Sequence, residues 1–214
     1  MGEPALTPER ILEAAEEVLR RFGPEKATVV DVARALGVTH SSVYRHFASK
    51  AALRDAVVRR WLDAMMPPLE AVAAEEGPAP GRLRRWLELL IAGKRRRATD
   101  DPELFATYSS LKMQARGVLQ AHVDALVDQA ARIIADGVAR GEFTAADPAA
   151  AGRAVLHATT RFHSPAHAAE WSDPAFGEAF DQVWHLLVSG LGAREPSKAA
   201  GDRDAARPGR NKRK

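Results

Sequence analysis

Cysteine is absent from this chain of 214 residues, and so are the long apolar runs that would place it in a membrane. Without cysteine the protein has no disulfide, no thiolate zinc ligand and no cysteine nucleophile. No apolar run approaches the roughly 18 residues that a membrane-spanning helix needs. The first ten residues also lack the basic and then apolar pattern of a signal peptide. We therefore expect a cytoplasmic protein without a membrane partner.

Motifs for catalysis or metal binding are missing as well. The sequence contains no G-x-S-x-G element, no phosphate-binding P-loop and no H-E-x-x-H zinc motif. Its nearest approach to a metal-ligand cluster is His157, His163 and His167, but Ser164-Pro165 would interrupt a helix between the last two. These absences predict that the protein is not an enzyme and carries neither a metal ion nor a cofactor.

Positive charge is scarce outside the C-terminal end. Residues 194–214 hold eight Lys or Arg and three Asp or Glu, a local charge of +5, whereas the whole chain carries +3. The remainder therefore carries −2, so overall charge does not indicate nucleic-acid binding, and any such function must rest on a local motif. The basic end can attract DNA nonspecifically or simply keep the protein soluble, and the sequence leaves both open.

The abundant residues favour helices. Ala, Leu, Arg and Glu have high helix propensity, and apolar residues recur at helical spacing along the chain. Helix starts combine a capping Thr, Ser or Asp with Pro or an acidic residue, and helix ends contain Gly or Pro. The starts lie at Thr7-Pro8, Thr28, Thr39, Ser49, Asp101-Pro102, Asp147-Pro148 and Asp173-Pro174; the ends lie at Gly23-Pro24, Gly37, Pro67-Pro68, Gly141 and Ser164-Pro165. This pattern predicts an all-α fold of about nine helices without strands.

The segment from Thr28 to Leu53 has the pattern of a helix-turn-helix. Two short capped helices flank Gly37, which adopts a left-handed conformation at little cost. The first helix would pack its apolar face beneath the second. The second exposes small or hydrogen-bonding side chains suited to the major groove of DNA, namely His40, Ser41, Ser42, Tyr44 and Arg45.

This segment resembles the N-terminal domain of the tetracycline-repressor (TetR) family of bacterial regulators. The resemblance rests on A-x-x-L-G-V at Ala33–Val38, on S/T-x-x-x-[VL]-Y-x-H/Y-F at Thr39–Phe47, and on S-K-x-x-L at Ser49–Leu53. It implies a sequence-specific transcriptional regulator, by default a repressor, whose partner is a double-stranded DNA operator.

The resemblance also implies roles for individual residues. Thr28, Tyr44, His46 and Lys50 would contact backbone phosphates, and the side chains along the recognition helix would reach the bases. The DNA-contacting set is Thr28, Thr39, His40, Ser41, Ser42, Tyr44, Arg45, His46 and Lys50. Alternatives remain open for three of them: Tyr44 could pack against the first helix, His46 could be structural, and Lys50 could be a solvated surface residue.

The chain divides into three predicted regions. Residues 1–52 form the helix-turn-helix domain, and a fourth helix at 50–66 connects it to the rest. Residues 53–192 form a helical ligand-binding and dimerisation domain, and residues 193–214 form a disordered basic tail. The larger domain is not needed to fold the smaller one, so we expect it to have a function of its own.

The larger domain is expected to bind a small-molecule effector of unknown identity. A pocket among the helices between Leu83 and Phe162 would be lined by Trp86, Phe105, Tyr108, Met113, His122, Leu126 and Phe162. His122 is the most informative member, because a histidine within an apolar stripe needs a polar partner from the protein or from a ligand. Each of these side chains can equally be an ordinary core residue.

We expect the last two predicted helices to form a homodimer, because the final one carries a wide apolar face. Its residues are Phe176, Phe180, Val183, Trp184, Leu187 and Leu191. The family resemblance implies a four-helix bundle between subunits, which would set two recognition helices about 34–36 Å apart or slightly more. The alternative is that this face packs in the protein's own core.

Together these features predict a regulator that a ligand releases from a palindromic operator. The ligand would shift the population towards a dimer whose connecting helix has swung. The alternative is a regulator controlled by a protein partner or acting without a ligand, which a collapsed cavity would favour.

Overall fold

A computed structural model describes residues 5–111 and 113–192. Every regular element in these ranges is helical, which confirms the all-α prediction. None of the helices described is both long and apolar enough to cross a membrane. In chain order the elements are α1 (Pro8–Lys26), α2 (Val29–Ala35), α3 (His40–Tyr44), α4 (Lys50–Asp63), α5 (Met66–Ala74), α6 (Ala79–Asp100), α7 (Pro102–Leu111), α8 (Arg116–Ala139), α9 (Pro148–Ala158), α10 (Thr160–His163), the 3-10 helix η1 (Pro165–Glu170) and α11 (Phe176–Gly190). The predicted basic tail at 193–214 lies outside the described residues.

Side-chain caps begin the N-terminal helices where the sequence places them. The hydroxyl of Thr7 accepts from the Arg10 amide at 3.3 Å, and that of Ser49 accepts from the Ala52 amide at 3.0 Å. Thr28 and Asp31 cap each other reciprocally, which satisfies two otherwise unpaired amides of the first turn. Because these bonds join residues only three positions apart, the sequence alone predicts where these helices begin.

Two predicted helices are each divided in the structure. The connecting helix is expected at 50–66, with Pro67-Pro68 ending or kinking it. In the structure α4 already ends at Asp63, and the two prolines lie in the first turn of the next helix, α5. Proline is tolerated there because first-turn amides have no partner within the helix. The helix that begins after Asp147 is likewise divided at Thr159 into α9 and α10.

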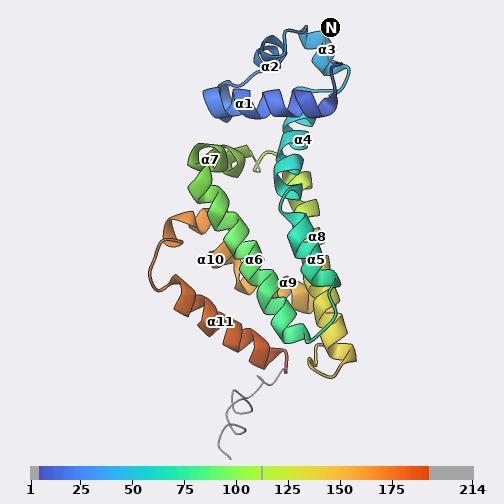
Figure 1. The fold of residues 1–214 in the computed structure, drawn as a ribbon, viewed down its shortest axis with the longest axis vertical. Helices are drawn as coiled ribbons and strands as arrows, with labels where there is room; N and C mark the ends of the chain where they lie inside the picture. Colours follow the sequence, from blue (N-terminus) through green and yellow to red (C-terminus); the bar gives the residue numbers. More distant parts are fainter. Residues whose placement is uncertain (1–4, 112, 193–214) are drawn as a thin grey trace, which may run out of the picture.

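The apolar side chains form two clusters. One lies among α5, α6, α8, α9 and α11, and the other joins α1, α2, α3 and α4 to Tyr108, Leu111, Ala115 and Val118 of the second half of the chain. In Figure 1, α7 lies beneath α1, and α4 runs from the N-terminal helices towards the larger region. Residues on both sides of the predicted domain boundary, between residues 52 and 53, therefore pack in one shared core. The boundary stays a prediction.

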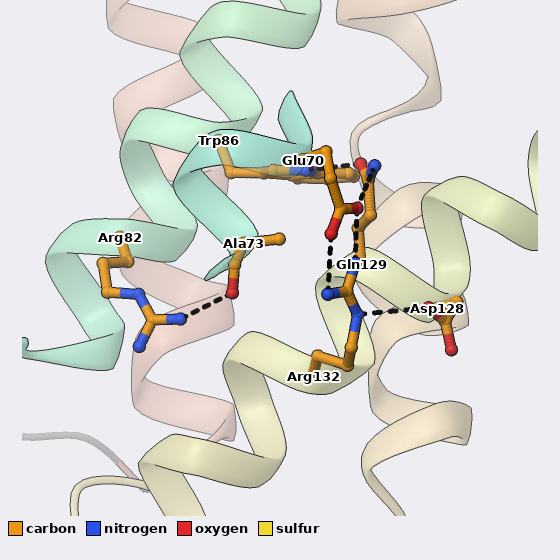
Figure 2. A network of polar contacts seen from close by, with 7 residues as sticks. All are labelled: Glu70, Ala73, Arg82, Trp86, Asp128, Gln129 and Arg132. Atoms are coloured by element: carbon orange, nitrogen blue, oxygen red, sulfur yellow. Dashed lines mark hydrogen bonds and ion pairs between the residues drawn. The ribbon is translucent and has the colours of Figure 1, made fainter. Parts of the chain in front are cut away.

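A polar network holds α5, α6 and α8 together (Figure 2). The buried Trp86 indole donates to Gln129 Oε1 at 3.0 Å, and Gln129 Nε2 donates to Glu70 at 2.9 Å. Arg132 binds the same Glu70 carboxylate through both terminal nitrogens, at 2.9 and 2.5 Å. Nearby, Arg82 donates to the Ala73 carbonyl at 2.9 Å. The larger region is thus bound internally by directional contacts as well as by apolar packing.

Candidate DNA-contacting surface and ligand cavity

The turn between α2 and α3 is set by Gly37. Its φ is +69°, and its amide donates to the Arg34 carbonyl at 3.1 Å while the Val38 amide donates to that of Ala33 at 3.0 Å. This pair of bonds is the Schellman arrangement, in which a left-handed residue closes a helix. It sets the direction of α3 relative to α2.

The recognition segment presents polar side chains to solvent. Most of the predicted DNA-contacting side chains are exposed, and only Ser42 is half-buried; the exposed ones are Thr28, Thr39, His40, Ser41, Tyr44, Arg45, His46 and Lys50. Tyr44 is 42% exposed, and its ring meets that of His40 edge to face at 6.2 Å between centroids. The structure therefore brings the predicted set to one accessible end of the molecule, around α3 (Figure 1).

Internal hydrogen bonds shape this surface. Thr39 Oγ1 accepts from the Ser42 amide at 3.3 Å and lies 3.0 Å from Ser42 Oγ. Arg45 Nη2 donates to Ser42 Oγ at 3.2 Å. Thr28 and Thr39 thus act as helix caps, and Ser42 holds the guanidinium of Arg45 on the exposed face.

A cavity of about 280 Å³ lies between α4, α6, α8, α9, α10 and the start of η1. Its wall is mostly apolar, with a small group of polar side chains. It is lined by Trp61, Leu62, Lys94, Leu119, His122, Val123, Leu126, Leu156, His157, Thr160, His163, Ser164 and Pro165. An apolar hollow with a few convergent polar groups is the usual form of a small-molecule site.

Of the seven residues predicted to line the pocket, His122 and Leu126 do so. Trp86 is fully buried and bonded to Gln129, and Phe105 is a core residue. Phe162 packs edge to face against Phe176 and Phe180, which keeps it in the apolar core.

The other two predicted residues are also elsewhere. Tyr108 is buried beside the N-terminal helices and stacks on Trp61 at 4.5 Å, and Met113 is 61% exposed. Sequence reasoning missed most of the lining because those residues come from six elements, and the spacing of residues within one helix does not report which other helix they meet.

Trp61 connects the cavity to the N-terminal helices. It lines the cavity from α4, while the Arg97 guanidinium donates to its backbone carbonyl at 2.5 Å and lies 4.8 Å from the centroid of its ring. The residue directly before Trp61 in α4, Arg60, donates to the Glu9 carbonyl of α1 at 3.2 Å. The same helix therefore contacts both the cavity and α1.

Two histidines in the cavity are held neutral. Burial, followed by the positive charges of Lys94 and Arg97, lowers the pKa of His122 to about 3. Burial and Lys94 also lower the pKa of His163 to about 4. His163 Nε2 lies 3.3 Å from the Leu156 carbonyl, whereas His122 Nε2 is buried without a hydrogen-bond partner.

The described residues offer no site for a metal ion. Within 5–111 and 113–192, no three His, Asp or Glu side chains lie close enough together to ligate one. His167, which the sequence groups with His157 and His163, pairs with Glu170 at 2.8 Å.

The predicted dimer face of α11 points mainly inward. Phe176, Phe180, Trp184 and Leu191 are buried within the protomer, and Val183 and Leu187 are half-buried. Leu186 is 74% exposed on the outer side of the same helix. The four buried residues therefore have the core role that was the alternative. A dimer interface on α11 stays a prediction, and such an interface would have to use the outer side of the helix.

The fold and its exposed recognition segment define a helix-turn-helix regulator with a second, larger helical region. Two family models match the chain: "Bacterial regulatory proteins, tetR family" at residues 11–57, and "Tetracyclin repressor-like, C-terminal domain" at residues 79–184. The chain belongs to the TetR family of bacterial regulatory proteins.

Individual relatives are distant. The chain is 31% identical over 85 residues to the nucleoid occlusion factor SlmA of Vibrio cholerae, covering 39% of this chain and 43% of that protein. It is 29% identical over 143 residues to the uncharacterized HTH-type transcriptional regulator YfiR of Bacillus subtilis, covering 65% and 69%. The chain therefore spans less than half the length of the SlmA relatives that it matches.

A solved structure shares the fold. SmeT, the repressor of a multidrug efflux pump of Stenotrophomonas maltophilia, superposes with a TM-score of 0.66 over 91% of this chain and 94% of its own, at 21% identity.

Proposed function

We propose that the protein is a sequence-specific transcriptional repressor that a small molecule releases from a palindromic operator. The observation that carries the proposal is the course of α4. It begins directly after the recognition segment, contacts α1 through Arg60, and lines the cavity with Trp61 and Leu62. A ligand in the cavity would therefore contact the element that supports the DNA-contacting surface.

Release requires that the ligand bind one position of α4 better than another, since only differential affinity shifts an equilibrium. The network around Glu70 and Gln129 fixes α5, α6 and α8 to one another. The break between Asp63 and Met66 separates α4 from this bound group. Movement of α4 against a fixed cavity wall is the simplest way for the two sites to communicate.

An open cavity favours ligand control over control by a protein partner alone. The neighbour SmeT has also been solved as a triclosan complex, so the same fold can hold a small aromatic molecule. Homodimerisation completes the proposal, because a two-fold dimer reads a palindrome.

The test is selection of bound duplexes from a random DNA pool with the purified protein at fixed moderate salt. We expect an enriched palindrome. Lys50→Ala should weaken binding to all sequences about equally and reduce the salt slope by about one, whereas Arg45→Ala should relax the base preference. Arg96→Ala, which removes an exposed charge from α6, is the matched control and should change neither. Absence of any enriched sequence from the unliganded protein would contradict the proposal.

A further inference from the structure

We propose that the cavity takes a neutral, mostly apolar molecule with one hydroxyl group, and that this hydroxyl pairs with the side chain of His122. The inference rests on the proposed function, because it names the chemical class of the effector that the regulatory site would bind. It is carried by the position of His122 in the cavity wall and by the state of its ring.

His122 offers the cavity a buried polar atom without a partner. The residue is 7% exposed, it lines the cavity from α8, and its Nε2 atom has no hydrogen-bond partner. A buried polar atom that stays unpaired is unfavourable, because it has lost its contact with water and gained no bond in return. A ligand that supplies the missing bond is therefore favoured over one of the same shape that does not.

Neighbouring polar groups of the wall are already engaged within the protein. The Thr160 hydroxyl donates to the Leu156 carbonyl at 3.0 Å, and His163 Nε2 lies 3.3 Å from the same carbonyl. The Ser164 hydroxyl accepts from a backbone amide at 3.4 Å. Among the buried polar side-chain atoms of the lining residues, all of which the structure describes, only Nε2 of His122 lacks a hydrogen bond. One unpaired atom in a mostly apolar wall predicts one polar group on the ligand.

The ring of His122 has open space on two sides. A second hollow of about 210 Å³ lies between α4, the start of α5 and α8, and both His122 and Leu62 line it as well as the cavity. Around α8, His122 lies between the residues of the two hollows, which are Val118, Ala121 and Ala125 on one side and Leu119, Val123 and Leu126 on the other. This space allows the ring to turn, so that a ligand reaches Nε2 without displacing a helix.

A hydroxyl is the group that fits a neutral imidazole. Burial, followed by the positive charges of Lys94 and Arg97, lowers the pKa of His122 and keeps the ring neutral. A neutral imidazole has one N–H and one lone pair, and a hydroxyl can accept from the first or donate to the second. It therefore pairs with Nε2 in either tautomer, and it enters the cavity without the desolvation cost of an ion. The same positive charges disfavour a cationic ligand.

The rest of the wall fits an apolar body. Leu119, Val123, Leu126 and Leu156 present hydrocarbon to the cavity. A volume of about 280 Å³ suits a molecule of one or two fused rings. The class of ligand is therefore a phenol or a cyclic alcohol of that size.

The experiment is isothermal titration calorimetry of the full chain at neutral pH with three probes of one shape. They are 2-naphthol, 2-methylnaphthalene, in which a methyl group replaces the hydroxyl, and 2-naphthoate. The protein is titrated into each probe, because the hydrocarbon is sparingly soluble. We expect 2-naphthol to bind at least about fivefold more tightly than either of the others, although a methyl group leaves water more readily than a hydroxyl.

Variants locate the effect. His122→Leu should weaken 2-naphthol binding by about fivefold or more and leave 2-methylnaphthalene binding unchanged or tighter, which removes the preference. His157→Leu is the matched control, because His157 also lines the cavity, from α9, but is exposed; it should preserve the preference. If His122→Leu does not fold, His122→Phe, whose ring has no nitrogen, takes its place, and the comparison of probes on the unaltered protein still decides the matter.

Three results would overturn the inference. One is a preference for 2-naphthol smaller than about fivefold on the unaltered protein. Another is a preference that survives in His122→Leu or is lost in His157→Leu. The third is failure of 2-naphthol and 4-ethylphenol both to bind at about 1 mM.

The titration contains no DNA, so its outcome is independent of operator release. A His122-dependent preference for the hydroxyl probe, with no effect of that probe on operator affinity, would uphold the inference and contradict the proposed function. Operator release by a molecule without a hydroxyl, unchanged in His122→Leu, would do the reverse.

Discussion

At His122, burial and neighbouring charge act in the same direction. The ring is enclosed by the cavity wall, and Lys94, Arg97 and His163 all disfavour a second proton on it, so its pKa falls from 6.5 to about 3. The sequence indicated that this histidine lies in an apolar stripe. It did not indicate the cations from α6 that face it, because they are distant in the chain.

The depressed pKa of His122 makes stability depend on pH. Below pH 6.5 the unfolded chain gains a proton on this residue that the folded protein does not take up until about pH 3. The free energy of unfolding is therefore complete above pH 6.5 and falls as the pH is lowered towards 3. At pH 5 the loss is about 2 kcal/mol from this residue. His163, whose pKa is also lowered, adds a loss of the same sign.

Urea unfolding followed by circular dichroism at pH 5, 6 and 7 measures this effect. His122→Leu should flatten the decline between pH 7 and 5, and the exposed His46→Ala should leave it unchanged. An equally steep decline in His122→Leu would show that other groups cause it.

Among the elements, α5, α6 and α8 are joined to one another by a network of side-chain hydrogen bonds, whereas α4 is bonded to α6 through the Arg97 guanidinium and the Trp61 carbonyl. Gln129 is central, because it accepts from Trp86 and donates to Glu70 at the same time (Figure 2). Gln129 is 3% exposed and its bond to Trp86 is buried, so water cannot replace Gln129 as the acceptor of the indole N–H. A buried amide with both ends satisfied fixes the register of three helices, which apolar packing alone specifies less strictly.

Removing this amide should destabilise the fold. Gln129→Leu leaves the buried Trp86 indole N–H without an acceptor, which costs about 1–3 kcal/mol. Gln120→Leu is the matched control on the same helix, because Gln120 is exposed and its side chain donates to the exposed Asp124. The expected loss of stability in this control is about 0.5 kcal/mol or less. Chemical denaturation compares the two, and equal free energies of unfolding would refute a structural role for the network.

For the molecule as a whole, the apolar side chains of α11 lie on two sides of the helix. Its inner side, with Phe176, Phe180 and Trp184, packs within the protomer. Its outer side carries Leu186, with Val183 and Leu187 at the margin. Helical periodicity alone did not separate the inner side of α11 from its outer side. Because most of the predicted residues are buried in the protomer, a homodimer through α11 would use fewer of them than expected.

A charge on the outer side tests the dimer. Leu186→Glu should raise the dimer dissociation constant by at least about tenfold, because a buried unpaired carboxylate is costly at an interface. Leu89→Glu, at a residue 40% exposed on α6, is the control and should leave it unchanged. Sedimentation velocity over a concentration series gives the answer. An unaltered dimer in Leu186→Glu would exclude this side of α11 from the interface.

The sequence by itself determined the features that depend on near neighbours. The caps at Thr7, Thr28 and Ser49, the turn at Gly37 and the exposed residues of α3 all result from bonds and backbone angles within a few positions of the chain. Such features are local, and residue type and spacing therefore fix them. The division at Pro67-Pro68 was misplaced for a related reason, since proline is compatible with both the end and the first turn of a helix.

Only the tertiary structure decided which residues form the cavity and which fill the core. Trp86, Phe162 and His122 all lie on apolar stripes, yet only His122 lines the hollow. The difference depends on where α4, α6, α8, α9, α10 and η1 meet, and on the Lys94 and Trp61 that other helices bring to the site. It also depends on the side of α11 that α6 covers. Helical periodicity reports that a side chain faces inward; the packing of distant helices determines whether it meets a neighbour or an opening.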